Sequence, residues 1–388
     1  MKNIIVDKIS NEIVNIVRKK YGKRKNYPLH SPKFYPDTFT DVNQVIKSTW
    51  VSSKGQEVQK FERKISSLVK SKYVLATNSG TSALHLAFLT INASPNDEII
   101  MPSINFIANA NAALYCGAKP VFIDCELNNL GISAEKIKSF IETKCKKIGK
   151  FYVNKKTKRK IKAVVAVHIF GNPCDIVKIK EMCKKYNLIL IEDAAECVGS
   201  FFEKRHLGTF GDFGILSFNG NKIVTTGSGG AIITKKKSDY KSINNYLNLN
   251  KSPTFQEEYN GIGYNYKMSA LNASLGVSQL KRIKSTLKKK REIFFFYKKI
   301  FMNSKFYKIN ETENQNLTNN WLINITLKND FIKYKNKILK KLNSKKIFCR
   351  SIWKPLHMLD HLKKYQKEDL KNTNKVFKRI ICLPSSLV

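Results

Sequence analysis

The stretch AVVAVHIFGNPCDIVKIKEMCKKYNLILIED, residues 163–193, decides the fold class. It contains two short apolar runs, AVVAVHIF and LILIED, with a stretch of helical spacing between them. Such alternation is typical of a βαβ unit, in which a helix joins two parallel strands. The stretch therefore predicts an α/β fold built on a mostly parallel sheet.

The same alternation continues in both directions along the chain. The further strand-like runs are YVLA (73–76), EIIM (98–101), PVFI (120–123), FGILSF (213–218) and GGAIIT (229–234). A helical pattern with one apolar face precedes them at about 56–70. After about residue 240 the pattern changes to a long Lys-rich helix at about 268–290 and then to mixed α/β sequence. We therefore expect a large domain at 28–240 and a smaller α/β C-terminal domain at 241–388.

Residues 1 to about 22 have the pattern of a basic amphipathic helix. Ile5, Ile9, Ile13 and Ile16 share one face of it. This face could pack on the body of the protein or lie on a membrane surface, and the sequence leaves both open. Three prolines between residues 28 and 36 then indicate an extended connector. We assign residues 1–27 to an N-terminal helical extension.

The composition is that of a folded protein with a large excess of positive charge. The chain has 388 residues, 42% of them hydrophobic, and 70 Lys and Arg against 29 Asp and Glu, for a net charge of +41. This hydrophobic content excludes disorder as the main state. Basic residues could bind nucleic acid or anionic lipid. Because they are spread over most of the chain, we expect solvated surface and no specific nucleic-acid partner.

The lengths of the apolar runs and the cysteine usage suggest a cytoplasmic protein. No apolar run reaches the ~18 residues that a membrane span needs, and Asp7 and Lys8 interrupt the first apolar stretch, so we expect neither membrane insertion nor a signal peptide. The eight cysteines include no C-x-x-C pair and none at metal-ligand spacing from a histidine. We expect reduced, mostly buried thiols and no metal site.

The first polar junction of interest follows the run YVLA. In an open parallel sheet, ligands bind beyond the carboxyl ends of the strands. Residues 77–82, TNSGTS, form a Gly-containing turn that enters the helical pattern ALHLAFL. Backbone N–H groups and the positive end of a helix suit a phosphate there, although a Ser or Thr N-cap without a ligand fits equally well. The chain has neither the P-loop motif nor the dinucleotide fingerprint.

Two further junctions carry an acid and an amine. Asp193 ends the apolar run LILIED, where a buried carboxylate needs a cation or hydrogen-bond donors, unless it is a helix N-cap. Lys222 lies in the polar Gly-rich turn after FGILSF, where a sheltered neutral amine could attack a carbonyl. A phosphate-binding turn, an acid for a ring nitrogen and a reactive lysine together are what pyridoxal phosphate (PLP) requires.

The blocks around these residues resemble a known family. NSGTSALHLAF, IMPSINFIANANA, VHIFGNPCDI, IEDAAE, GTFGDFGILSFNGNKIVTTGSGG and GYNYKMSALNASLG are similar, in this order, to the DegT-type sugar aminotransferases, which are PLP enzymes of the aspartate-aminotransferase fold. The resemblance runs from about residue 28 to the C-terminus. PLHSPKF, STWVSSKG, SFNGNK, RSIWKPLHM and CLPSS resemble most the branch that serves legionaminic acid and bacillosamine pathways.

The resemblance implies roles for individual residues at the cofactor ring. Lys222 is expected to bond covalently to PLP and then to move a proton. Asp193 is expected to face the pyridine nitrogen, and Phe106 to stack on the ring. Glu196 stands where many relatives have Gln or His near the 3′ oxygen, so its contact there stays open. The alternatives are that Phe106 belongs to the core and that Glu196 is a solvated helix residue.

The resemblance also implies a phosphate site and a shared dimer site. Gly80, Thr81 and Ser217 are expected to hold the phosphate, joined by Asn265 from the other subunit of a homodimer, unless Asn265 is a turn residue. Trp50, Ser52 and His357 fall in blocks that line the sugar-nucleotide region in relatives, as does Arg350. We expect His85 and His168 to be structural, because lone histidines on apolar segments are most often core residues.

The implied activity is a PLP-dependent transamination. The amino group is expected to pass from glutamate to C4 of a nucleotide-linked 4-keto-6-deoxy sugar, UDP-linked with a 2-acetamido group or GDP-linked, for surface glycan synthesis. Two alternatives remain. One is a sugar dehydratase of the same fold, against which Lys222 argues because such relatives have His at its position. The other is a basic nucleic-acid-binding or regulatory protein without turnover.

Overall fold

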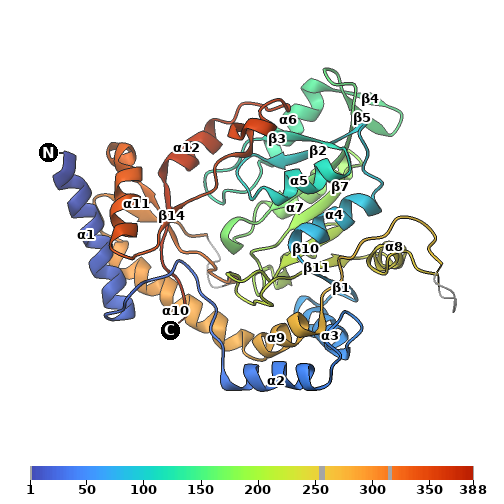
Figure 1. Cartoon of the computed structure of the whole chain (residues 1–388). Coiled ribbons are helices and arrows are strands. Elements are labelled where there is room, and N and C mark those ends of the chain that lie inside the picture. The colour runs from blue at the N-terminus through green and yellow to red at the C-terminus, as the bar shows by residue number, and fades with distance from the viewer. Residues whose placement is uncertain (1, 253–257, 313–316, 388) are drawn as a thin grey trace.

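A computed structural model describes residues 2–252, 258–312 and 317–387 (Figure 1). In these residues, a nine-stranded sheet has the main order β1-β11-β10-β7-β6-β2-β3. These strands are β1 (Tyr73–Thr77), β2 (Asp97–Pro102), β3 (Lys119–Ile123), β6 (Lys160–Val167), β7 (Ile189–Asp193), β10 (Phe213–Ser217) and β11 (Gly230–Thr234). Of the pairs along this path, only the two that involve β11 are antiparallel. The α/β fold with a mostly parallel mixed sheet is confirmed.

The register of the sheet brings chemically useful residues to one edge. Asp193, the last residue of β7, pairs with Val167 at the end of β6 and with Ile215 in β10. Most residues of the three strands are buried and apolar, which is typical of parallel strands covered on both faces. The carboxylate of Asp193 is therefore fixed at the carboxyl edge of the sheet by the pairing of its own strand.

Helices pack on the sheet and on one another. The helices of this part are α3 (Gln56–Val69), α4 (Gly80–Thr90), α5 (Ala108–Tyr115), α6 (Ala134–Lys144), α7 (Ile176–Lys185) and α8 (Lys237–Leu247). Two hairpins, β4 (Cys145–Ile148) with β5 (Phe151–Asn154) and β8 (Phe201–Phe202) with β9 (Arg205–His206), complete it. Helix α4 contacts β1, β10 and β11. Its N-terminus is thereby placed beside the strand ends.

The helix expected at about 268–290 is two helices, so that prediction is wrong. Helix α9 (Ala270–Lys281) packs on α3 and on α2 (Pro36–Lys47), whereas α10 (Ile283–Phe301) packs on α1 (Lys2–Tyr21). Helix α9 and the first turns of α10, including Ile283 and Leu287, pack on the core of the large unit. From Ile293 onward, α10 packs in the core of the small unit. Arg282 marks the break, and its guanidinium pairs with Asp37 at 2.7 Å.

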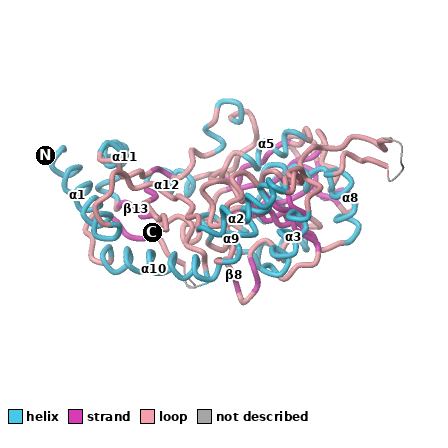
Figure 2. Tube along the Cα trace, turned by 60° about the horizontal axis from the view of Figure 1, so that its bottom comes forward, coloured by secondary structure: helices cyan, strands magenta, loops and turns pink. Residues whose placement is uncertain are grey.

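The C-terminal part is built on a four-stranded antiparallel sheet with the order β12-β13-β15-β14. Its elements are β12 (Tyr307–Ile309), β13 (Asn324–Leu327), β14 (Arg350–Ser351), β15 (Ile380–Cys382), α11 (Lys335–Ser344) and α12 (Lys371–Arg379). Figures 1 and 2 show α1, α11 and α12 at the opposite end of the molecule from α8. This agrees with a smaller α/β unit beside the large one.

Helix α1 confirms the amphipathic pattern of the N-terminus. Ile9 and Ile13 are fully buried in the same cluster as Ile293 and Tyr297 of α10. The apolar face therefore packs on the protein itself. None of the described helices is long and apolar enough to cross a membrane.

The domain limits stay a proposal. We propose the ranges 1–27, 28–240 and 241–388 as the extension, the large domain and the small domain. The packing adds that α1 shares the core of the small unit, while α9 contributes Ala273, Val277 and Leu280 to the core of the large one.

Candidate active site

A cavity of about 260 Å³ lies at the carboxyl edge of the sheet. Its lining includes seven residues that the sequence predicts for the cofactor site, namely Gly80, Thr81, Phe106, Asp193, Glu196, Ser217 and Lys222. The small unit adds Trp321, Arg350 and Trp353. Strand ends, the N-terminus of α4 and the small unit thus enclose one space.

The N-terminus of α4 forms one wall of the cavity. Ser79 is the N-cap, and its hydroxyl accepts the N–H of Ser82 at 3.1 Å. The N–H groups of Gly80 and Thr81, in the first turn, have no partner within the helix. A Cβ atom at Gly230 would lie 2.5 Å from the carbonyl of Ser79 and 2.6 Å from the nitrogen of Gly80. Only glycine lets β11 approach this turn, so a narrow cradle of N–H groups results, which fits a phosphate.

Asp193 is held as a fixed acceptor. It is 6% exposed, and its Oδ2 accepts a hydrogen bond of 2.6 Å from Nδ2 of Asn109. Its Oδ1 accepts the N–H of Ala195 at 3.0 Å. The sequence prediction missed Asn109, although it lies in the quoted block IMPSINFIANANA. Two donors keep the carboxylate directed into the cavity, where it suits a protonated ring nitrogen.

Lys222 and Glu196 lie close together. Nζ of Lys222 is 3.4 Å from Oε1 of Glu196 and 3.8 Å from the ring centroid of Trp321. Glu196 is 8% exposed, so its alternative as a solvated helix residue is wrong. Burial raises the pKa of Glu196, and the ammonium of Lys222 and the N–H of Phe170 partly offset this increase.

Glu196 also supports a strained turn. Its Oε2 accepts the N–H of Phe170 at 2.7 Å, and Phe170 has a left-handed backbone with φ of 59°. The ring of Phe170 stacks on Trp353 with centroids 5.5 Å apart. A strained backbone persists only where surrounding contacts hold it. Here the carboxylate of Glu196 and the ring of Trp353 hold Phe170 beside the cavity.

Phe106 is not a core residue. It is 54% exposed and lines the cavity from the loop between β2 and α5. The alternative that it belongs to the core is therefore wrong. A flat ring there can stack on a planar ligand.

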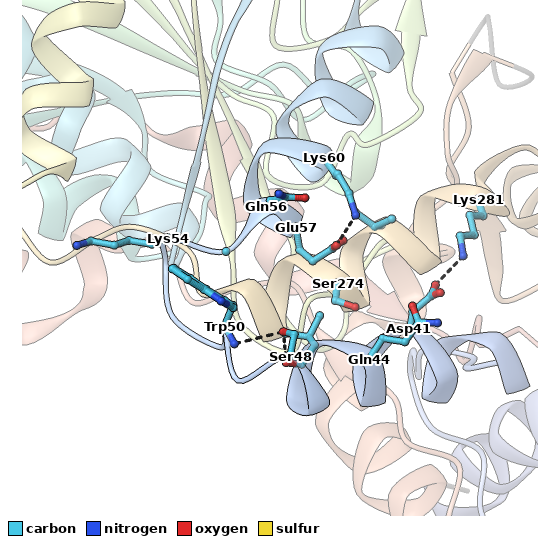
Figure 3. A pocket seen from close by; sticks show the side chains of 13 residues that line it. Asp41, Gln44, Ser48, Trp50, Lys54, Gln56, Glu57, Lys60, Ser274 and Lys281 are labelled. Atoms are coloured by element: carbon cyan, nitrogen blue, oxygen red, sulfur yellow. Dashed lines mark hydrogen bonds and ion pairs between the residues drawn. The ribbon is translucent and has the colours of Figure 1, made fainter.

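Four expected residues do not line this cavity. Trp50 is 63% exposed and lines a separate pocket of about 660 Å³ between α2, α3 and α9, where Figure 3 shows it beside Ser48 and Lys54. Ser52 lies in the same α2–α3 connection, and its carbonyl accepts the N–H of Ala270 at 3.0 Å. Their sugar-nucleotide role stays a proposal.

His357 and Asn265 are the other two. His357 is buried, and its Nδ1 lies 2.7 Å from the hydroxyl of Ser103, so it supports the loop that carries Phe106. The carbonyl of Asn265 accepts a hydrogen bond of 3.1 Å from Nδ2 of Asn78. Asn265 thus lies near the turn that starts α4 without lining the cavity of its own chain.

The two histidines predicted to be structural, His85 and His168, do not line the cavity. Nδ1 of His85 lies 3.1 Å from the hydroxyl of Tyr266, and its ring packs edge-on against Tyr115 and Tyr264. His168 is fully buried, with Nε2 2.9 Å from Oε2 of Glu192.

The cysteines and the possible metal-binding side chains of the described residues give no sign of a second site. All eight cysteines are free, and all but Cys116 are buried. Within the described residues, no group of His, Cys, Asp or Glu could hold a metal ion.

Residues 34–387 match the model of the DegT/DnrJ/EryC1/StrS aminotransferase family. The chain belongs to this family. It is 33% identical to the GDP-perosamine synthase of Escherichia coli O157:H7, over 89% of this chain and 90% of that one. It is 29% identical to the UDP-4-amino-4,6-dideoxy-N-acetyl-beta-L-altrosamine transaminase of Campylobacter jejuni subsp. jejuni serotype O:23/36 (strain 81-176), over 85% of each.

The solved structures agree on the fold. The PLP form of Spr1654 from Streptococcus pneumoniae superposes with a TM-score of 0.82 at 22% identity, over 93% of each chain. Aminotransferases of this DegT family depend on PLP, and this chain is accordingly a PLP-dependent aminotransferase. The glycine-built cradle and the fixed carboxylate fit the phosphate and ring nitrogen of that cofactor.

Proposed function

We propose that this chain moves an amino group from glutamate to C4 of a nucleotide-linked 4-keto-6-deoxy sugar, for surface glycan synthesis in the cytoplasm. The names of the two relatives, one GDP-linked and one UDP-linked, support this substrate class. Free cysteines fit a reducing compartment. The observation that carries the proposal is the shared cavity of Lys222, Asp193 and the cradle at Gly80.

The residue roles follow from this arrangement. Gly80, Thr81 and Ser217 would hold the phosphate, Asp193 would keep the ring nitrogen protonated, and Phe106 would cover the ring. When bound, PLP supplies an aldehyde that combines with amines and a ring that withdraws electrons. The chain supplies a cavity, a fixed charge and a base.

Lys222 would be that base as well as the attachment point. Its free neutral amine can accept the proton lost from the α-carbon of the donor and can return it. Glu196 and the ring of Trp321 limit where this amine can stand, because they contact it on two sides. The side chain of Lys222 is 13% exposed.

A homodimer would complete the site. Phe106, Tyr115 and Ile262 are large apolar residues with exposed fractions of 54%, 59% and 76%, which suggests a surface covered by another copy. Asn265 would reach the phosphate of the neighbouring copy. Trp50 and Ser52 would contact the nucleotide sugar, with His357 behind the Phe106 loop.

The test combines trapping and turnover. Borohydride reduction of the PLP-loaded protein should leave the cofactor mass on the peptide that contains residue 222, and Lys222→Ala should lose it. Lys178→Ala is the control, because this exposed surface lysine would report non-specific labelling. Mass spectrometry should then detect amino transfer from glutamate to a sugar in a panel of UDP- and GDP-linked 4-keto sugars. Labelling at other lysines alone, or no transfer to any sugar, would overturn the proposal.

A further inference from the structure

Trp321 is fixed by hydrogen bonds at three points. Its indole N–H donates to the carbonyl of Asn221 at 2.6 Å, which ties the ring to the backbone next to Lys222. Its backbone N–H donates to Oδ1 of Asn319 at 2.9 Å, and Nδ2 of Asn319 donates to the carbonyl of Glu196 at 2.7 Å. The third point is its carbonyl. The ring that contacts Nζ of Lys222 therefore has little freedom.

One donor to that carbonyl is Lys290 of α10. Its Nζ donates to the carbonyl of Trp321 at 2.9 Å and to that of Ser385 at 2.6 Å. Lys290 is fully buried and lines none of the site described above. Burial lowers the pKa of Lys290 well below its usual value. Two of the N–H donors of Nζ thereby have a carbonyl acceptor each.

A buried lysine between two carbonyls is a costly way to fill a core. A Met or Leu would fill the same volume without the loss of hydration of an amine. The C-terminal segment already has other anchors, since the hydroxyls of Tyr297 and Tyr21 donate to the carbonyl of Pro384 at 2.9 and 3.2 Å. The hydroxyl of Ser385 also donates to the carbonyl of Trp321 at 3.0 Å. Lys290 adds a second hydrogen bond to the same carbonyl and joins it to the carbonyl of Ser385.

We propose that Lys290 is a positioning residue for the transamination: by holding the carbonyl of Trp321, it keeps the indole against Nζ of Lys222. The indole then fixes where the free amine of Lys222 stands when it takes up or releases a proton. Loss of Lys290 slows proton transfer and leaves donor binding unchanged. An ångström of misplacement costs about 10²-fold, and we expect about tenfold for this indirect contact.

The test compares Lys290→Met with Tyr297→Phe. Both residues are fully buried in α10 and both contact the C-terminal segment, but Tyr297 does not reach Trp321. With α-deuterated and ordinary glutamate, single-turnover absorbance of the PLP form should show a slower step and a larger isotope effect in Lys290→Met, at unchanged apparent affinity for glutamate. Tyr297→Phe should match the wild type in both. A second readout is the rate at which cofactor-free protein captures PLP, which should fall in Lys290→Met only.

Two variants keep the proposal testable if Lys290→Met does not fold. Ser385→Ala removes the other donor to the Trp321 carbonyl, at 3.0 Å, and should lower both rates in the same direction. Trp321→Phe should lower them more, because it loses the anchor at Asn221. Wild-type rates and isotope effects in Lys290→Met would overturn the role. If Lys290→Met does not fold, wild-type values in both Ser385→Ala and Trp321→Phe would overturn it. The choice of glutamate as the amino-group donor in this test rests on the proposed function. If glutamate fails with the wild type, that function fails, and the PLP-capture rates still decide the role of Lys290.

Discussion

At the scale of single residues, Glu196 carries a prediction about pH. Burial raises its pKa, so between the unfolded value of about 4.3 and the folded value only the folded protein holds the proton. The contribution of Glu196 to the free energy of unfolding should therefore fall as pH rises through this interval. Each unit of difference in pKa is worth about 1.4 kcal/mol.

Glu196→Gln tests this sign, because glutamine does not titrate. Urea unfolding of cofactor-free protein from about pH 4 to pH 7 should show that the variant gains stability relative to the wild type as pH rises, since all other groups are shared. A difference that runs the other way would mean that Lys222 and the N–H of Phe170 outweigh burial in setting the charge of Glu196.

Gly230 carries a prediction about the cradle. Gly230→Ala should cost about 1–3 kcal/mol of stability and weaken PLP binding, because the new Cβ would meet the backbone of Ser79 and Gly80. Gly220→Ala is the matched control, since its Cβ would meet only the carbonyl of Gly227 at 3.6 Å. PLP titration by absorbance and urea unfolding measure the two effects. Equal PLP affinity in the two variants would show that the close approach does not shape the phosphate site.

What the sequence could predict of the site depended on where each residue stands along the chain. Asp193 and Lys222 follow apolar runs, and the ends of parallel strands share one edge, so their meeting could be expected. Trp321 and Asn319 come from a different unit of the chain and meet Glu196 and Lys222 only through packing. No local pattern of polar and apolar residues encodes such a contact, so it required the structure.

At the scale of elements, apolar runs predicted each of the seven main-path strands, because strands covered on both faces, parallel or antiparallel, are continuous apolar runs. The division of the 268–290 helix was missed because a helical pattern continues across Arg282. The change from one core to the other comes later, between Leu287 and Ile293 of α10, and the Arg282–Asp37 ion pair fixes α2 beside the break.

Helix α1 gives the prediction at this scale. Ile13→Ala should cost about 2–4 kcal/mol, because it empties a fully buried position between α1 and the small unit. Ile4→Ala, at a position that is 69% exposed, should cost less than about 0.5 kcal/mol. Urea midpoints at unchanged slope measure both. If Ile13→Ala were as harmless as Ile4→Ala, the apolar face would not contribute to folding and binding to an anionic lipid surface would have to be tested.

At the scale of the whole molecule, we propose that a second copy completes the cavity. Phe106, expected to cover the cofactor, is itself more than half exposed, and Asn265 lies outside the cavity of its own chain. A second copy related by a two-fold axis would supply the missing cover to both sites at once, because such an interface is reciprocal. The high net charge of the chain does not prevent this, since repulsion between exposed charges more than ~8–10 Å apart is largely screened at physiological salt.

Complementation between two defective variants tests this sharing. Lys222→Ala removes the attachment point of its own chain, and Asn265→Ala removes the group that the chain gives to its neighbour. In a mixed dimer, one site carries both defects and the other carries neither, so random mixing of the subunits should restore about a quarter of wild-type sites. Each variant alone should have little activity. As a control, a mixture of Lys178→Ala and Lys222→Ala should show only the activity that its Lys178→Ala subunits have by themselves. If instead the Asn265→Ala defect stays with its own chain, mixing will restore nothing, and Asn265 serves the site of the subunit that carries it.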